Sequence, residues 1–169
     1  LIAVETRSAE RIEPFCRLFT QCGGCELQHM RYEEQLKSKY DMILGALRSA
    51  KLGVQDIDKL EAVGPGDPYS YRRRISLHID QTGKVGFYRE ASRTVVATDH
   101  CPVAVGPIND VLKGLAAFGR EVMGRLTSVL LEADSDGVVA VLKSPYAFAP
   151  TEIRALLDIG RKYFQNAVL

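Results

Sequence analysis

The sequence lacks the features that mark several large classes of protein. Its apolar runs are far too short to cross a bilayer, so we expect no membrane partner, and residues 1–5 show neither a basic leader nor a small-residue cleavage site. The formal net charge is only +1, which excludes a highly basic, nonspecific nucleic-acid binder but leaves room for a local basic patch. No glycine-rich strand-to-helix turn of the dinucleotide or phosphate-loop kind is present, so the simplest evidence for a nucleotide site is missing.

Both ends of the sequence look like points at which a longer sequence was divided. With 169 residues, the chain suits one domain, or one domain with an appended segment. It starts without Met, and it stops in an apolar run, 166–169, that could open a strand. We therefore expect a piece of a longer protein, in which residues 1–14 are a linker from a missing N-terminal domain.

A cysteine-rich loop and a helix follow this linker. Residues 15–30 combine three cysteines with Gly23 and Gly24, a composition that favours a binding loop over a regular helix or strand. From residue 32 onward, apolar residues recur every three or four positions and predict an amphipathic helix that ends before Gly53. The apolar positions are Tyr32, Leu36, Tyr40, Ile43 and Leu47.

The remaining patterns predict a sheet and two more helices. Alternation at 75–79, a turn at Thr82-Gly83, and runs at 85–89 and 94–98 predict an antiparallel meander over 71–98. Helical spacing over 108–122, just after Pro107, predicts a second helix. Runs at 129–133 and 138–142 predict a hairpin, and Thr151 is predicted to cap a third helix over 152–163. The fold class expected for residues 31–169 is α+β, with a mainly antiparallel sheet flanked by helices.

The four cysteines argue for ligation rather than for a disulfide framework, because intracellular thiols are kept reduced. Cys16, Cys22 and Cys25 form the pattern C-x5-C-x2-C, and Cys101 follows much later, just before Pro102. Three thiolates in one short loop, with a fourth brought in by the fold, suit a 4Fe-4S cluster.

Other interpretations of the cysteines stay open. A structural zinc ion also takes four thiolates, although it usually takes them as two short pairs rather than as three plus one. Four unrelated buried thiols are a third interpretation, and His29 offers a substitute ligand.

Three strings in the sequence resemble a known family. They are Cys16 followed by Cys22-Gly23-Gly24-Cys25-Glu26-Leu27-Gln28-His29, then Tyr71-Arg72-Arg73-Arg74 with Val85-Gly86-Phe87-Tyr88-Arg89, and finally Cys101-Pro102. Together they resemble the S-adenosylmethionine-dependent RNA uracil-5-methyltransferases that carry a 4Fe-4S cluster. The resemblance covers approximately residues 14–103.

The resemblance implies a set of expectations. Cys16, Cys22, Cys25 and Cys101 would ligate the 4Fe-4S cluster, and residues 31–169 would form the central domain, which contacts RNA. The full-length enzyme would modify a uridine in rRNA or tRNA, in the cytoplasm. Its C-terminal methyltransferase domain, which binds S-adenosyl-L-methionine, is missing from this sequence. No catalytic residue can be assigned, so we expect this chain alone to be an inactive monomer.

Cations and aromatic rings gather on the predicted meander. Arginine pairs with phosphate and stacks on bases, and aromatic rings stack on unpaired nucleotides. RNA contact is therefore predicted, against the plainer interpretation of a solvated strand end, and Phe87 is assigned to the opposite, core face. Gln28 and His29 either orient the RNA or the loop, or cap the first helix. The predicted RNA-binding residues are Arg72, Arg73, Arg74, Tyr88, Arg89, Arg93 and His29.

Two further functions remain compatible with the sequence. A small iron-sulfur electron-transfer or redox-sensing protein would show reversible reduction of its cluster. A zinc-stapled RNA-binding module would be colourless, whereas a 4Fe-4S protein is brown.

Overall fold

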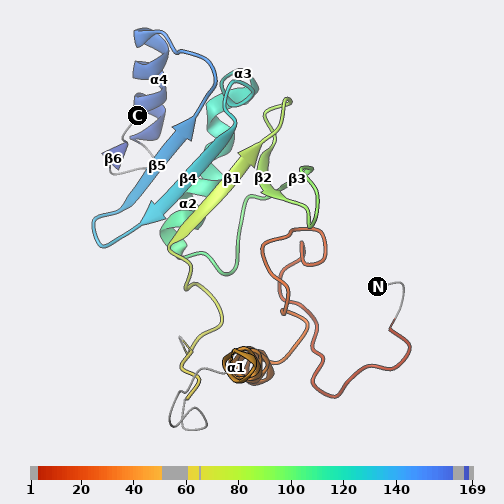
Figure 1. Ribbon diagram of the computed structural model, residues 1–169. Coiled ribbons are helices and arrows are strands. Elements are labelled where there is room, and N and C mark those ends of the chain that lie inside the picture. Colours follow the sequence, from red (N-terminus) through yellow and green to blue (C-terminus); the bar gives the residue numbers. More distant parts are fainter. Residues whose placement is uncertain (1–3, 51–60, 65, 162–165, 168–169) are drawn as a thin grey trace.

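The computed structural model describes residues 4–50, 61–64, 66–161 and 166–167 (Figure 1). The helices are α1 (Tyr32–Ser49), α2 (Gly106–Gly114), the 3-10 helix η2 (Leu115–Phe118), α3 (Gly119–Met123) and α4 (Pro150–Gly160). The strands are β1 (Arg74–Ile79), β2 (Val85–Tyr88), β3 (Val95–Ala97), β4 (Ser128–Ala133), β5 (Val138–Lys143) and β6 (Asn166–Ala167).

The strands form one sheet in the order β3-β2-β1-β4-β5-β6. All neighbouring pairs are antiparallel except β5 and β6, which run parallel. The predicted meander is β1-β2-β3, and the predicted hairpin is β4-β5. Asp134 fixes the hairpin turn by accepting hydrogen bonds from the amides of Asp136 and Gly137, at 2.7 and 3.1 Å. The expected α+β class with a mainly antiparallel sheet is confirmed.

One face of the sheet carries the hydrophobic core. Side chains alternate across a strand, so Ile75 and Leu77 of β1 lie on the same face, where they are buried, while Arg74 is exposed. Helix α2 covers this face (Figure 1). The side chains that are buried almost completely are Leu77, Ile108, Val111, Val129 and Leu131. Burying each of them contributes roughly 1.5–3 kcal/mol to the free energy of unfolding, so the centre of the sheet contributes strongly to the stability of the fold.

The segment predicted as one helix over 108–122 is divided into α2, η2 and α3, so the prediction of a continuous helix is wrong. Its apolar spacing is correct, since Ile108, Val111 and Phe118 are buried. The division falls near Gly119, whose φ of +69° and ψ of 153° no right-handed helix contains. Helix α2 begins at Gly106, which places Pro107 in the first turn.

Helix α4 also begins earlier than predicted. It starts at Pro150, so Thr151 lies inside the first turn and is not the N-cap. The carboxylate of Glu152 instead accepts a hydrogen bond from the amide of Ala149 at 2.7 Å and pairs with Arg125. The Ala149 amide and the Arg125 guanidinium hold the pKa of Glu152 below its usual value. The predicted end of this helix, Tyr163, lies outside the described residues.

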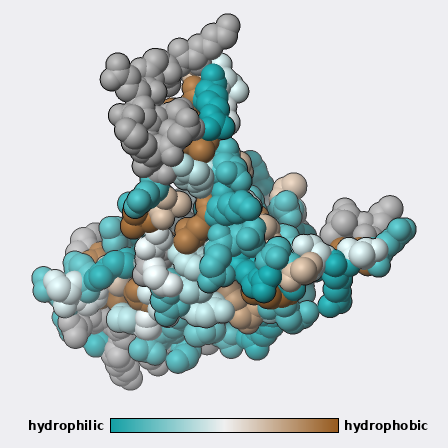
Figure 2. Space-filling view, turned by 90° about the horizontal axis from the view of Figure 1, so that it is seen from below, coloured by the Kyte–Doolittle hydropathy of each residue, from teal (hydrophilic) through white to brown (hydrophobic). Residues whose placement is uncertain are grey.

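Helix α1 stands apart from the sheet, beyond the cysteine-rich loop (Figure 1). It ends at Ser49, before Gly53 as predicted. Leu44 is buried, whereas Ile43, which was predicted for the apolar face, is 58% exposed. Among the described helices, none is long and apolar enough to span a membrane. Seen from the α1 side, the surface is mostly hydrophilic, with small separate hydrophobic patches (Figure 2).

Candidate metal centre

The loop that carries three cysteines folds through short turns and docks on the edge of the meander. The amide of Cys22 donates to the carbonyl of Leu18 at 2.8 Å, which closes one turn. The amide of Gly23 donates to the carbonyl of Tyr88 at 2.9 Å, and Cys22 forms an isolated bridge with Arg89. A Cβ at residue 23 would lie 3.1 Å from the backbone of Glu90. A glycine at position 23 therefore lets the loop approach the β2 backbone closely.

The fourth cysteine is positioned by a buried asparagine that the sequence analysis missed. Asn109, on α2, accepts a hydrogen bond from the amide of Cys101 at 2.8 Å. Its side-chain nitrogen donates to the carbonyls of Cys101 and Ala104, both at 3.1 Å. Asn109 is only 6% exposed. The sequence held one signal for Asn109: it is a polar amide beside the apolar positions of a predicted helix, and a buried amide needs hydrogen-bond partners.

The four cysteines line one pocket between the loop and the sheet, and all four are half-buried, free thiols. The pocket wall also includes the rings of Phe19 and Phe87. Phe87 packs against the hydrophobic core, as its predicted alternation requires. Cys101 thus lines the same pocket as the three loop cysteines, and their role as a ligand set stays a prediction.

Gln28 holds the loop in place. It is 6% exposed, and its side-chain oxygen accepts a hydrogen bond from the amide of Cys16 at 3.3 Å. Helix α1 has Arg31 at its N-cap without a side-chain cap bond, so Gln28 does not cap this helix. His29 packs its ring near that of Phe19, with the ring centroids 5.7 Å apart, and its carbonyl accepts a hydrogen bond from the Ile12 amide.

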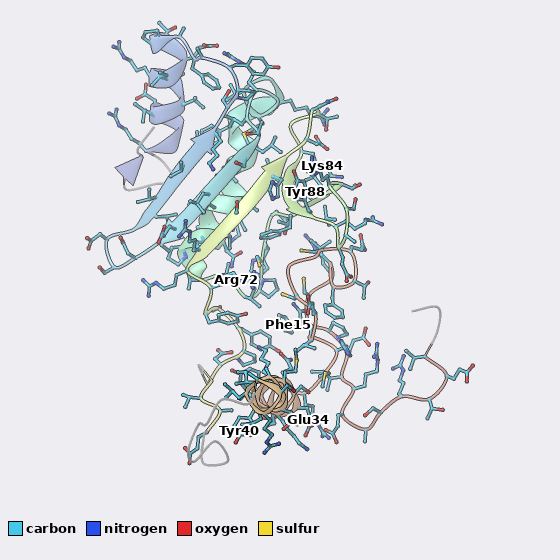
Figure 3. All side chains as sticks on the ribbon, viewed as in Figure 1. Phe15, Glu34, Tyr40, Arg72, Lys84 and Tyr88 are labelled. Carbon is cyan, nitrogen blue, oxygen red and sulfur yellow. The ribbon has the colours of Figure 1, made fainter. Side chains whose placement is uncertain are left out.

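Arg72 lies against the cysteine pocket (Figure 3). Its backbone is paired with the turn after Cys101, because its amide donates to the carbonyl of Val103 at 2.7 Å and its carbonyl accepts from the amide of Val105 at 3.0 Å. This pairing holds Arg72 beside the thiols, and its positive charge partly offsets the rise in the pKa of Cys22 and Cys101 that burial causes.

Burial dominates the titration of two cysteines. It raises the pKa of Cys22, and the neighbouring Cys25 and Cys16 raise it further, whereas the Gly24 amide and Arg72 lower it. Burial likewise raises the pKa of Cys101, against the amides of Val103 and Ala104. Burial therefore favours the neutral thiol at Cys22 and Cys101, and a metal that binds there must displace their protons.

The donors suit a thiolate-bound metal in type and number. Four sulfur ligands and nearby backbone amides are the groups that iron-sulfur clusters and structural zinc share. Across the described residues, no three or more His, Cys, Asp or Glu side chains stand in an arrangement that could hold a metal ion directly. The pocket brings four sulfur atoms to its wall, and the thiol positions do not form a closed cage.

The predicted RNA-binding residues divide into separate groups. Arg72 belongs to the cysteine pocket, and His29 lies on the loop. Arg73 donates to the carbonyl of Ala133 at 3.1 Å, and Arg74 lies 3.8 Å from the carboxylate of Glu132.

The other three predicted residues lie on β2 and the turn that follows it. Arg89 and Arg93 are exposed. The ring of Tyr88 stacks on His78 of β1, with centroids 3.6 Å apart and planes 6° apart. The group of Tyr88, Arg89 and Arg93 adjoins the cysteine-rich loop through the bridge between Cys22 and Arg89.

Known proteins similar to this chain fall into one class. No protein-family model matches it. A relative from Shewanella sediminis, named 23S rRNA (uracil(1939)-C(5))-methyltransferase RlmD, is 32% identical over 166 residues, which cover 92% of this chain and 36% of the relative. The protein of the same name from Vibrio parahaemolyticus is 31% identical over 172 residues, covering 96% of this chain and 38% of the relative.

A third relative and a solved structure extend the comparison. An uncharacterized RNA methyltransferase from Clostridium acetobutylicum is 36% identical over 116 residues, covering 66% of this chain and 25% of the relative. The crystal structure of a Pyrococcus abyssi tRNA (uracil-54, C5)-methyltransferase with S-adenosyl-L-homocysteine has a TM-score of 0.50 and 24% identity, covering 78% of this chain and 34% of that one. The structure supports the fold alone.

These relatives define the class as RNA methyltransferases. More specifically, the chain is a relative of the RNA uracil-C5-methyltransferases, as the sequence strings predicted. It spans between a quarter and two fifths of the length of the curated relatives that it matches.

Proposed function

We propose that this chain is the iron-sulfur-carrying, RNA-contacting part of an S-adenosylmethionine-dependent RNA (uracil-5-)-methyltransferase that acts on rRNA or tRNA in the cytoplasm. The observation that carries the proposal is the meeting of Cys16, Cys22 and Cys25 with Cys101 at one pocket. The relatives, which match nearly the whole chain and are named as uracil-C5-methyltransferases, support it. On this proposal, methyl transfer and S-adenosylmethionine binding would belong to a domain outside this chain, which spans 36% and 38% of the length of those relatives.

The four thiols would hold a 4Fe-4S cluster, which when bound supplies a cross-link between the loop and the domain. The remaining residues of the pocket fit this role. Arg72 offsets the negative charge of thiolates, and Phe19 and Phe87 exclude water. Gln28 and Asn109 hold the two cysteine-bearing segments by their amides.

RNA contact is assigned to the strand residues beside the loop. Tyr88, Arg89 and Arg93 provide a ring and two exposed cations on β2 and the turn after it, and Arg73, Arg74 and His29 complete the predicted set. Exposed arginines beside an aromatic ring can hold both phosphates and bases of an unpaired strand.

Metal analysis of the chain tests the proposal. The protein is purified without oxygen, its absorption is recorded near roughly 400 nm, and iron, sulfide and zinc are counted per chain. We expect a brown protein with about four irons and four sulfides. Cys101→Ser should lose most of this iron, whereas His29→Ala should keep it, because His29 is not expected to be a ligand.

Three results would contradict the proposal in different ways. One zinc ion per chain, with neither iron nor sulfide, would replace the cluster by a zinc staple. Equal iron content in Cys101→Ser and the wild type would remove Cys101 from the ligand set. Reversible electron transfer without RNA affinity would favour a redox protein.

A further inference from the structure

A second cavity, of about 480 Å³, lies beside the cysteine pocket at the β2–β3 side of the sheet. It is bounded by the β1–β2 turn, the end of β3, α2 and α3, and Thr98 lines both this cavity and the cysteine pocket. Four exposed cations line it, and Asp99 is the one carboxylate among its lining residues. The cations are Arg17, Lys84, Lys113 and Arg120.

A close backbone contact joins the two segments that carry two of these cations, Lys84 and Arg120. Gly83 has a φ of +76°, and a Cβ built on it would lie 3.0 Å from the carbonyl oxygen of Arg120 and 3.3 Å from the Cβ of Met123. The β1–β2 turn therefore packs directly on the start of α3. Lys84, which follows Gly83 and is labelled in Figure 3, lines the same cavity as Arg120.

The charges in this cavity are only partly balanced. Arg17 pairs with Asp99 at 2.6 Å, and Lys113 lies 3.4 Å from Asp110. Within the described residues, Lys84 and Arg120 form no ion pair.

The carboxylate nearest to Lys84 along the chain is already engaged in the turn. Asp80 accepts hydrogen bonds from the amides of Thr82 and Lys84, at 2.9 and 3.1 Å. In a chain of net charge +1, this is a local concentration of positive charge facing a concave surface.

We propose that this cavity binds phosphate groups of the RNA backbone, through Lys84 and Arg120 as the primary contacts. The inference rests on the proposed function and adds residues outside the predicted strand set. Since the four cations are exposed, they suit the solvated phosphates of a polymer rather than an enclosed small ligand. Because the cavity adjoins the cysteine pocket, RNA held at β2 would continue across it.

Salt-dependent RNA binding tests this inference. The 169-residue chain, purified without oxygen, is titrated into a labelled uridine-containing RNA hairpin at several salt concentrations, with fluorescence anisotropy as the readout. We expect Lys84→Glu and Arg120→Glu each to weaken binding roughly five- to tenfold at low salt. Each should also reduce the slope of log affinity against log salt by about one.

The matched control is Arg154→Glu, an exposed cation on α4 at the opposite side of the sheet (Figure 1). It makes the same change of charge and should leave affinity within about twofold of the wild type, since it removes no phosphate contact. Circular dichroism confirms that each variant is folded.

The outcomes separate this inference from the function on which it rests. If the wild type binds RNA and both cavity variants match it in affinity and slope, the phosphate site is wrong and the RNA-binding role stands. If the wild type does not bind RNA, the RNA-binding role fails and the cavity proposal fails with it. If poly-aspartate of equal charge binds through Lys84 and Arg120 while RNA does not, the surface serves an acidic protein instead.

Discussion

Gly23 is a residue at which the cysteine loop packs closely on the backbone of Tyr88 and Glu90. Replacing it with alanine would push a methyl group to within 3.1 Å of the Glu90 backbone and 3.2 Å of the Tyr88 carbonyl oxygen. Since backbone atoms cannot swing away as a side chain can, we expect Gly23→Ala to destabilise the protein by about 1–3 kcal/mol in urea unfolding. It should also lower metal content.

Gly45 provides the control for Gly23. It lies in α1 with open space around its Cβ position, so Gly45→Ala should stabilise the helix by roughly 0.5–1 kcal/mol. Equal unfolding midpoints for Gly23→Ala and the wild type would show that the loop is not packed on β2 as described.

The hydrogen bonds of Asn109 lead to a second prediction for a single residue. Asn109→Asp replaces the donor that serves two carbonyls with an acceptor that repels them. We expect a loss of about 2–3 kcal/mol in urea unfolding and weaker metal retention, because two buried acceptors lose their partner. Asp110→Asn, the reverse change at the adjacent exposed position, should cost less than about 1 kcal/mol. Comparable losses in both variants would show that the hydrogen bonds of Asn109 to Cys101 and Ala104 do not stabilise the fold as described.

Individual side chains were predictable where a short motif defines them. The spacing of Cys16, Cys22 and Cys25 predicted one binding loop, and these three cysteines line a pocket together with Cys101. Asn109 and the pairing of Arg72 with the Cys101 turn were not predictable, because both depend on which segments become neighbours in space. Arg72 shows the difference: in sequence it belongs to a run of three arginines, and in the fold it faces the thiols.

Among the elements, the break between η2 and α3 gives a testable case. The φ and ψ of Gly119 lie in a region that is almost exclusive to glycine, and a Cβ there would meet nothing within 4 Å. We therefore expect Gly119→Ala to cost about 1–3 kcal/mol through backbone strain alone, measured by urea unfolding. Gly106→Ala, at the start of α2 with equally open space, should be nearly neutral. If the two variants are equally stable, the break does not depend on glycine.

The elements themselves followed from periodicity more reliably than their ends did. Alternation identified β1, which has one buried face, and short runs of residues beside turn signals identified β2, β3, β4 and β5. Periodicity does not report a local backbone angle, so 108–122 was predicted as one helix. The parallel pairing of β6 with β5 likewise depends on the path of the chain through α4.

For the whole molecule, the cysteine pocket lies at one side of the hydrophobic core, which it adjoins at Phe87 and Cys101. The core is centred on β1, β4 and α2, while the pocket lies at the loop beside β2. Stripping bound metal with a chelator should therefore speed hydrogen exchange at amides of 16–25 and 101–104 about tenfold or more. Amides of β1 and β4 should keep their protection. Loss of protection throughout the sheet would mean that the metal supports the entire fold.

The distribution of the cysteines also sets an order of events during biogenesis. Cys25 and Cys101 are separated in the chain by β1, β2 and β3, and Asn109 of α2 must be in place to present Cys101. The meander and α2 therefore have to assemble before four thiols can meet. A nascent chain that has emerged only as far as β2 offers three sulfurs and no closed site. On the proposed function, delivery of a four-thiolate cofactor would follow the synthesis and folding of α2.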